Sequence, residues 1–277
     1  KDQNQDQKQE RERLTLCVST QVGCPLDCVF CATATMGFQR SLTAGEIVDQ
    51  VMIAGRIAER KITNIVYMGM GEPLLNYDEV MKSVEIITTG LKIAARRVTI
   101  STAGWTPGIR RMAAEKQRVK LAISLHTLDE RARTELMPVT KKFPLVELLD
   151  AAEYYYWRTK QRITFEYILF DGWNDSDADI RRLVALLKRI PGKVNIIPFH
   201  SIEFSLPAGM PATLRPSPPR RIDAFARKLR AGHVTVFVRS SAGEDINAAC
   251  GQLAVRHAAR TRRTAPGAGL LKPVTSN

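Results

Sequence analysis

The feature that most constrains the fold is a regular alternation of short β-branched runs with amphipathic helical stretches. Strands separated by helices build a parallel sheet, because each helix returns the chain to the edge where the strand began. The runs predicted to be strands are residues 14–19, 64–68, 97–101, 120–124, 164–170, 194–198 and 233–238. The chain is therefore predicted to be an α/β protein built as a parallel β/α barrel.

Three connecting helices carry clear boundary signals. Thr43 and Glu46 have the spacing of a capping box ahead of a one-sided apolar stripe, formed by Ile47, Val48, Val51, Ala54 and Ala58. Pro144 opens a second helix, whose stripe is Leu145, Leu148, Leu149 and Ala152. A third helix is predicted over 176–190, where Pro191 and Gly192 stop it.

Polar and glycine-rich clusters follow four of the predicted strands: GMGEP at 69–73, STAG at 101–104, SLH at 124–126 and PFH at 198–200. In a parallel barrel these positions meet at one rim, where binding and catalytic residues concentrate. Glycines let the backbone approach a ligand, Glu72 can accept from an ammonium group, and serine and histidine can bond a carboxylate or ribose. A ligand site is predicted at this rim.

Cys24, Cys28 and Cys31 have the spacing C-x3-C-x2-C in the run GCPLDCVFC. Thiolates suit zinc or iron–sulfur clusters, and a closed structural site takes four protein ligands. Three local thiolates therefore indicate a cluster whose fourth corner is open. The alternative is a structural zinc site that recruits Cys17 or Cys250, although no second C-x2-C pair accompanies the triplet. A disulfide framework is disfavoured because the cysteines are odd in number, the chain is far longer than disulfide-stapled mini-domains, and no secretory apolar segment opens it. We therefore expect a reducing, cytoplasmic environment.

The charge of the chain favours a polyanionic partner. Its 277 residues include 41 Lys and Arg against 28 Asp and Glu, a formal net charge of +13. Residues 1–12 have no apolar residue and are predicted to be a polar leader, residues 13–255 the catalytic barrel, and residues 256–277 a disordered basic tail. No apolar stretch is long enough to span a membrane.

The motifs together resemble the radical S-adenosylmethionine (SAM) RNA adenine methyltransferases of the RlmN/Cfr type. The similar blocks are TLCVSTQVGCPLDCVFCATATMGF, NIVYMGMGEPLLN, RRVTISTAG, AISLHTLDERAR, VNIIPFH and GEDINAACGQL. The resemblance implies a partial (β/α)6 TIM-like barrel with an extra flanking strand and a C-terminal helix. It also implies that the cysteine triplet holds a [4Fe-4S] cluster. Its open iron would bind SAM, which would be contacted by Gly71, Glu72, Ser101, Ser124, Leu125, His126 and His200.

The resemblance also assigns the two cysteines outside the triplet. Carbon-2 of adenine is electron-poor, so ordinary nucleophilic methyl transfer cannot reach it. By similarity, Cys250 takes a methyl group from a first SAM, a second SAM supplies the radical, and the resulting carbon joins protein to RNA. Cys17 then forms a transient disulfide with Cys250 and releases the methylated RNA. In the absence of these roles, both cysteines would be small buried side chains.

The sequence departs from the family pattern in two places. Members have a helical N-terminal RNA-binding domain and a proton-abstracting glutamate ahead of the first strand, whereas residues 1–13 here form a polar leader in which we assign no base. His200 stands where many members have asparagine.

The predicted function is methylation of carbon-2 of an adenine in 23S rRNA and also in tRNA, by a monomer that a flavodoxin or ferredoxin reduces. The alternatives are methylation of carbon-8, as in Cfr, a zinc-stabilised RNA-binding protein without catalysis, and a radical SAM enzyme acting on a protein or small molecule.

Overall fold

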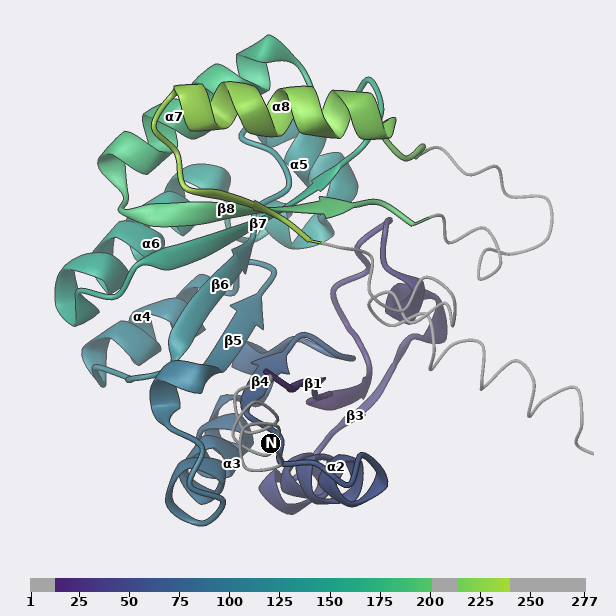
Figure 1. Cartoon of the computed structure of the whole chain (residues 1–277), viewed down its shortest axis with the longest axis vertical. Helices are drawn as coiled ribbons and strands as arrows, with labels where there is room; N and C mark the ends of the chain where they lie inside the picture. The colour runs from purple at the N-terminus through teal and green to yellow at the C-terminus, as the bar shows by residue number, and fades with distance from the viewer. Residues whose placement is uncertain (1–12, 201–213, 240–277) are drawn as a thin grey trace, which may run out of the picture.

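A parallel sheet organises the computed structural model, which describes residues 13–200 and 214–239. Its strands lie in the order β1-β4-β5-β6-β7-β8-β9, and every neighbouring pair is parallel. The sheet curls into a half-barrel with β1 and β9 at its edges (Figure 1). The strands are β1 Thr15–Cys17, β4 Asn64–Tyr67, β5 Val98–Thr102, β6 Lys120–Ser124, β7 Ile163–Leu169, β8 Gly192–Pro198 and β9 Val236–Val238.

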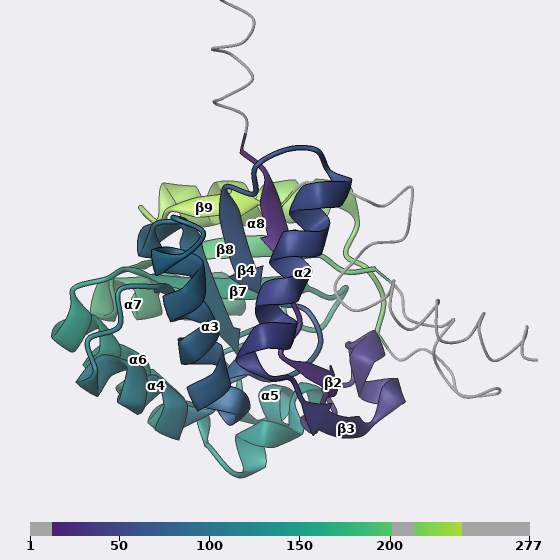
Figure 2. The same ribbon diagram turned by 90° about the horizontal axis from the view of Figure 1, so that it is seen from below.

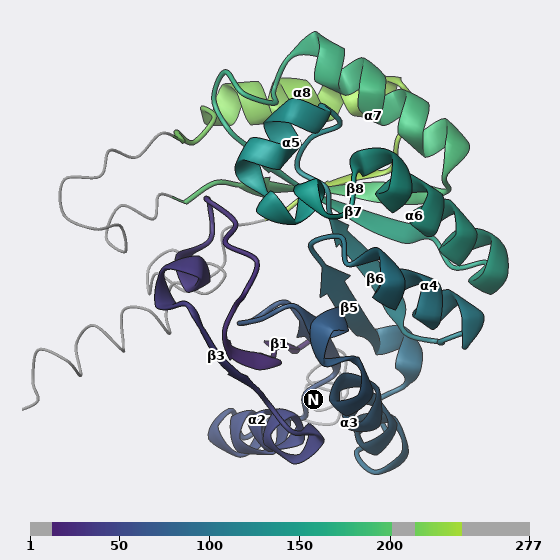
Figure 3. The same cartoon turned by 180° about the vertical axis from the view of Figure 1, so that it is seen from behind.

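Helices cover the convex face of this sheet (Figures 1 and 3). Seen from below, α2 and α3 lie side by side near β1 and β4 (Figure 2), and they pack on each other. The α-helices are α2 Ala44–Ile57, α3 Tyr77–Thr89, α4 Thr106–Ala114, α5 Glu130–Leu136, α6 Leu145–Thr159, α7 Asp177–Arg189 and α8 Pro219–Ala231. Short 3-10 helices are η1 Ala32–Met36, η2 Pro73–Asn76, η3 Ala95–Arg97 and η4 Pro138–Lys141. None of the described helices is long and apolar enough to cross a membrane.

The two faces of each strand have different chemistry. Ile100, Ile123 and Phe165 point to the helices and are fully buried in the core. The alternate residues, such as Thr99 and Ser124, point to the concave side and are half-buried. A parallel sheet covered on both faces would be apolar on both. The polar concave face therefore marks the side of the half-barrel that is available to a ligand.

All seven predicted strands are confirmed, with changed ends. The first and last are shorter than predicted, and the strands predicted to begin at 164 and 194 begin one and two residues earlier. Thr43 and Glu46 form the predicted capping box, Pro144 caps α6, and Ser176 caps α7. The apolar stripe of α2 was predicted one residue too long, because Ala58 is its exposed C-cap.

A short antiparallel hairpin was missed by the sequence analysis. Strand β2 (Gln21–Gly23) pairs with β3 (Phe38–Ser41), and the cysteine run lies between them. Strands this short give no readable alternation. Gly23 has a φ of +78°, and a Cβ built there would lie 1.7 Å from the carbonyl oxygen of Gly37. Only glycine fits where the hairpin closes the cysteine loop.

The predicted ends of the chain lie outside the described residues. This applies to the leader at 1–12, the tail at 256–277 and any helix after β9. These boundaries stay predictions.

Candidate functional site

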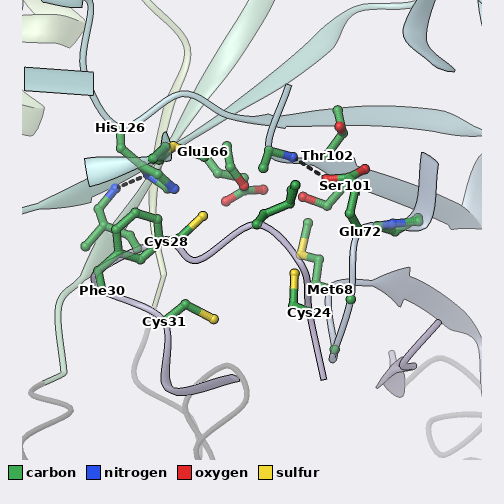
Figure 4. Close-up of a pocket in the computed structure, with 18 of the residues that line it drawn as sticks. Cys24, Cys28, Phe30, Cys31, Met68, Glu72, Ser101, Thr102, His126 and Glu166 are labelled. Carbon is green, nitrogen blue, oxygen red and sulfur yellow. Dashed lines mark hydrogen bonds between the residues drawn. The ribbon is translucent and has the colours of Figure 1, made fainter. Parts of the chain in front are cut away.

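The carboxyl ends of the strands and the loop between β2 and β3 enclose a cavity of about 790 Å³, part of which is open to solvent (Figure 4). Residues from distant parts of the chain meet there, as predicted for the rim of a parallel barrel. The predicted site residues that line it are Cys24, Cys28, Cys31, Gly71, Glu72, Ser101, Ser124 and His126.

The three cysteines lie on one loop that hydrogen bonds to other segments fix at its start and in its middle, and that a bond within the loop closes at its end. The amide of Cys24 donates to the carbonyl of Gly37 at 3.1 Å, and the amide of Cys31 donates to the carbonyl of Cys28 at 3.0 Å. Between them, the amide of Val29 donates to the carbonyl of Leu136 at the end of α5, at 3.0 Å. The loop is therefore held by both the hairpin and the barrel.

The environment of the thiols suits a bound cation. Burial raises the pKa of Cys24 to about 12, and burial together with the nearby cysteines raises the pKa of Cys28 well above its ordinary value. A metal reverses this effect, because coordination stabilises the thiolate. No three Cys, His, Asp or Glu side chains of the described residues converge on one ion site. Three thiols that surround a space fit a cluster, whose irons each take a separate thiolate.

Glu72 is the buried carboxylate of the site. Its Oε1 accepts from the amide of Leu74 at 3.0 Å and its Oε2 accepts from the amide of Ala103 at 2.7 Å. Burial raises its pKa to about 7, which the backbone hydrogen bonds partly oppose. One carboxylate thus joins the loops after β4 and β5, and it retains lone pairs for a ligand ammonium.

Close backbone packing explains the glycines of GMGEP. Gly71 has a φ of +98°, and its backbone lies against Gln21. A Cβ on Gly69 would lie 2.6 Å from the hydroxyl of Ser19 and 2.8 Å from the carbonyl of Val18. These glycines bring the loop after β4 against the strand-to-hairpin connection and so shape the cavity wall.

His126 is a buried neutral histidine. Its Nδ1 accepts from the amide of Ile168 at 3.1 Å, so its proton is on Nε2. Burial, with a smaller contribution from Arg133, lowers its pKa to about 3. The ring of Phe30, from the cysteine loop, meets the imidazole edge to face at 4.7 Å. His126 therefore offers a hydrogen-bond donor and an aromatic surface without a charge.

Arg133 was missed by the sequence analysis. It is fully buried on α5, and its guanidinium donates to neutral oxygens of four other residues: Thr140, Ala103, Ser124 and Leu125. It thereby ties together the carboxyl ends of β5 and β6 and the loops that follow them, where Ser101, Ser124 and His126 lie. In the sequence it is one of several arginines in an amphipathic helix, and only packing distinguishes it.

Glu166 was also missed. It lies on the concave face of β7, is 4% exposed, lines the cavity, and its Oε2 accepts from the side-chain Nδ2 of Asn195 at 2.7 Å. Burial raises its pKa. A lone carboxylate inside the apolar run ITFEYIL was the signal that could have identified it.

Four predicted site residues are not among the lining residues. Leu125 is fully buried in the core and reaches the site through its backbone. Cys17 is exposed on β1 in register with Val66, and His200 follows β8 by two residues. Cys250 lies outside the described residues. The roles of these residues stay predictions.

Fold and site define the class of protein. The sequence profile of the radical SAM superfamily matches residues 18–184, and the chain belongs to this superfamily. Membership implies a [4Fe-4S] cluster and SAM, which agrees with a three-thiol loop beside a polar cavity. A crystal structure of SuiB from Streptococcus suis bound to SAM shares the fold, with a TM-score of 0.62 at 16% identity over 86% of this chain and 53% of that chain.

The family within the superfamily follows from closer relatives. The probable dual-specificity RNA methyltransferase RlmN of Akkermansia muciniphila is 45% identical over 250 residues, which cover 90% of this chain and 68% of that protein. The RlmN of Desulfotalea psychrophila is 45% identical over 88% of this chain and 69% of that protein. A crystal structure of a radical SAM methyltransferase from Sphaerobacter thermophilus has a TM-score of 0.81 at 45% identity, covering 87% of this chain and 70% of that chain. The chain belongs to the RlmN family.

Proposed function

We propose that the chain is an RNA methyltransferase that transfers a methyl group to carbon-2 of an adenine in 23S rRNA and in tRNA. The observation that carries the proposal is the three-cysteine loop on a cavity lined by Glu72, Ser101, Ser124 and His126, in a chain of the RlmN family. We further propose that it acts as a cytoplasmic monomer and that a flavodoxin or ferredoxin reduces it.

Different residues of the cavity would bind the iron–sulfur cluster and SAM. Cys24, Cys28 and Cys31 would hold the cluster, which supplies the electron that cleaves SAM and releases a carbon radical. Glu72 would accept from the SAM ammonium group, while the hydroxyls of Ser101 and Ser124 would bond its carboxylate or ribose. The buried wall around these side chains would keep water away from the radical.

Cys250 and Cys17 would direct the chemistry to RNA. Cys250 would carry the methyl carbon on its sulfur, so that two SAM molecules are used in each turnover, and this carbon would then join the adenine ring. The Cys17 thiolate would attack the sulfur of Cys250, form a disulfide and release the RNA. The position of Cys17 on the concave face of β1, exposed and in register with Val66, supports this role.

Metal analysis tests the cluster. Protein purified without oxygen should be brown and should contain about four irons and four sulfides per chain. Serine substitution at the three triplet cysteines should remove both. A colourless protein that binds one zinc and no SAM would identify the zinc-stabilised RNA-binding alternative and refute the enzyme.

Trapping the covalent intermediate tests the two remaining cysteines. Cys17→Ala should accumulate protein joined to RNA, because the disulfide that releases the RNA cannot form. The double variant with Cys250→Ala should form no adduct, since it lacks the sulfur that carries the methyl carbon. Denaturing gel electrophoresis of protein with labelled RNA measures both. An adduct that persists without Cys250 would contradict the assignment.

A second candidate function is methylation of carbon-8 of adenine, because the RlmN/Cfr type that the sequence resembles includes enzymes of both kinds. Mass spectrometry of nucleosides from RNA treated with the enzyme separates the products, and 2-methyladenosine is the expected one.

A further inference from the structure

Four basic side chains lie at the opposite end of the sheet from the cavity. Arg13 and Arg96 precede β1 and β5, Lys120 begins β6, and Lys193 lies at the start of β8. We call them the base cations. None of them has a carboxylate of the described residues within ion-pair distance. Partial burial and the repulsion of Lys193, Arg13 and Arg96 lower the pKa of Lys120, so these three charges lie close enough to Lys120 to repel it.

Two of the base cations, Lys120 and Lys193, lie on the concave face of the sheet, which also lines the cavity. Side chains alternate along a strand, so Lys120 points to the same side as Ser124, and Lys193 to the same side as Ile197. Ser124 and Ile197 both line the cavity. The four residue steps from Lys120 to Ser124, and from Lys193 to Ile197, each correspond to about 13 Å of strand. Two of the base cations therefore lie on the same face of the sheet as the residues that line the cavity.

An exposed aromatic ring lies beside these charges. Phe237 on β9 is 54% exposed, and the ammonium of Lys193 lies 5.3 Å from the centre of its ring. Phe237 points to the same side of the sheet as Arg239, which lines the cavity. Cations that attract a phosphate backbone, together with an aromatic ring on which a base can stack, are typical of sites for unpaired nucleic acid.

We propose that the base cations bind phosphates of an unpaired RNA strand and that Phe237 stacks on one of its bases, so that the amino end of the concave face is part of the RNA path. The proposal rests on the RNA methyltransferase function proposed above. It places Cys17 on the path, because Cys17 lies on the concave face of β1 between Arg13 and the rim.

The shape of the face favours RNA over a folded acidic protein. Lys120 and Lys193 lie on the concave face of a curled sheet, which a thin, flexible strand can follow more closely than a globular protein can. An exposed aromatic ring can stack on a nucleic-acid base and so strengthen RNA binding. It offers no comparable contact to the carboxylates of an acidic protein.

RNA binding of charge variants tests the proposal. In Lys120→Gln/Lys193→Gln, the affinity for an unpaired RNA oligonucleotide should fall about tenfold, and the slope of log affinity against log salt should fall by about two. Lys82→Gln/Lys188→Gln removes the same charge from exposed positions on the outer helices α3 and α7, and should leave both quantities close to wild type. Fluorescence anisotropy with the iron–sulfur protein measures them.

Two more variants separate charge and stacking from misfolding. Lys120→Arg/Lys193→Arg keeps the charges and should keep the affinity, whereas Phe237→Ala should weaken binding about tenfold without changing the salt slope. SAM cleavage in the absence of RNA reports that each variant is folded.

The outcomes distinguish this proposal from the function on which it rests. If the wild type methylates RNA but Lys120→Gln/Lys193→Gln binds RNA as tightly as the control Lys82→Gln/Lys188→Gln, the RNA path is overturned and the proposed function is not. Loss of reduction by flavodoxin with RNA binding intact would assign the face to the electron donor and also overturn it. A wild type that neither binds nor methylates RNA overturns the proposed function and the RNA path together.

Discussion

Glu72 shows how one buried carboxylate couples the site to pH. Its pKa rises from 4.5 to about 7 because burial disfavours the charge. Between these values the folded state binds more protons than the unfolded state, so stability falls as pH rises, and no further loss occurs above about pH 7. The full shift corresponds to up to about 3 kcal/mol.

Glu72→Gln removes this titration and keeps the side-chain size. Wild type should lose stability between about pH 4.5 and pH 8, whereas the variant lacks this loss. The free energy of unfolding of the variant should therefore rise relative to that of wild type by up to about 3 kcal/mol over this range. Urea denaturation of the two iron-free proteins at each pH measures this difference. The contributions of other titrating groups are the same in both proteins and cancel. A constant difference over this range would show that Glu72 is ionised throughout. SAM binding should also weaken in the variant, because its ammonium acceptor is neutral.

Arg133 combines a buried charge with hydrogen bonds to four residues. A lysine keeps the charge but lacks the planar fork that reaches several carbonyls at once. We expect Arg133→Lys to lower the free energy of unfolding by about 2 kcal/mol and to weaken SAM binding, because the loops after β5 and β6 lose their shared anchor. Arg131→Lys is the matched control, since Arg131 is on the same helix and is 91% exposed. Equal stability of the two variants would contradict the anchoring role.

At the scale of the element, the loop after β4 depends on close backbone contact. Gly69→Ala would place a methyl group 2.6 Å from the Ser19 hydroxyl and 2.9 Å from the Ser19 amide. We expect a loss of stability of about 1 to 3 kcal/mol and weaker SAM binding, since the cavity wall must shift. Gly55→Ala, in the last turn of α2, meets no atom closer than 3.9 Å and should stabilise the protein by up to about 1 kcal/mol. Thermal unfolding of both variants provides the test, and a harmless Gly69→Ala would refute it.

Elements with strong local signals were predictable from the sequence. The capping box of α2 and the starts of α6 and α7 are fixed by a few adjacent residues. The β2–β3 hairpin was not predictable, because its strands are short and are brought together by a glycine contact between Gly23 and Gly37. This hairpin positions the cysteine loop, so the sequence indicated the ligands without indicating what holds them.

For the whole molecule, strand order decides which residues meet. Parallel pairing places the ends of β4, β5, β6 and β7 at one rim, and this brings Glu72, Ser101, Ser124 and His126 to one cavity. The same pairing gathers the base cations at the other end. The net charge of +13 indicated a polyanionic partner, but only the order of the paired strands shows that four of these charges gather at one end of the sheet.

The sequence by itself determined the α/β class, the cysteine triplet predicted to hold the cluster, the rim residues and the family resemblance, because each depends on residue type and local spacing. The tertiary structure decided the surroundings of Arg133, Glu166 and the base cations. Their importance depends on burial and on the alternation of side chains in a paired sheet, and neither is visible until distant segments are packed together.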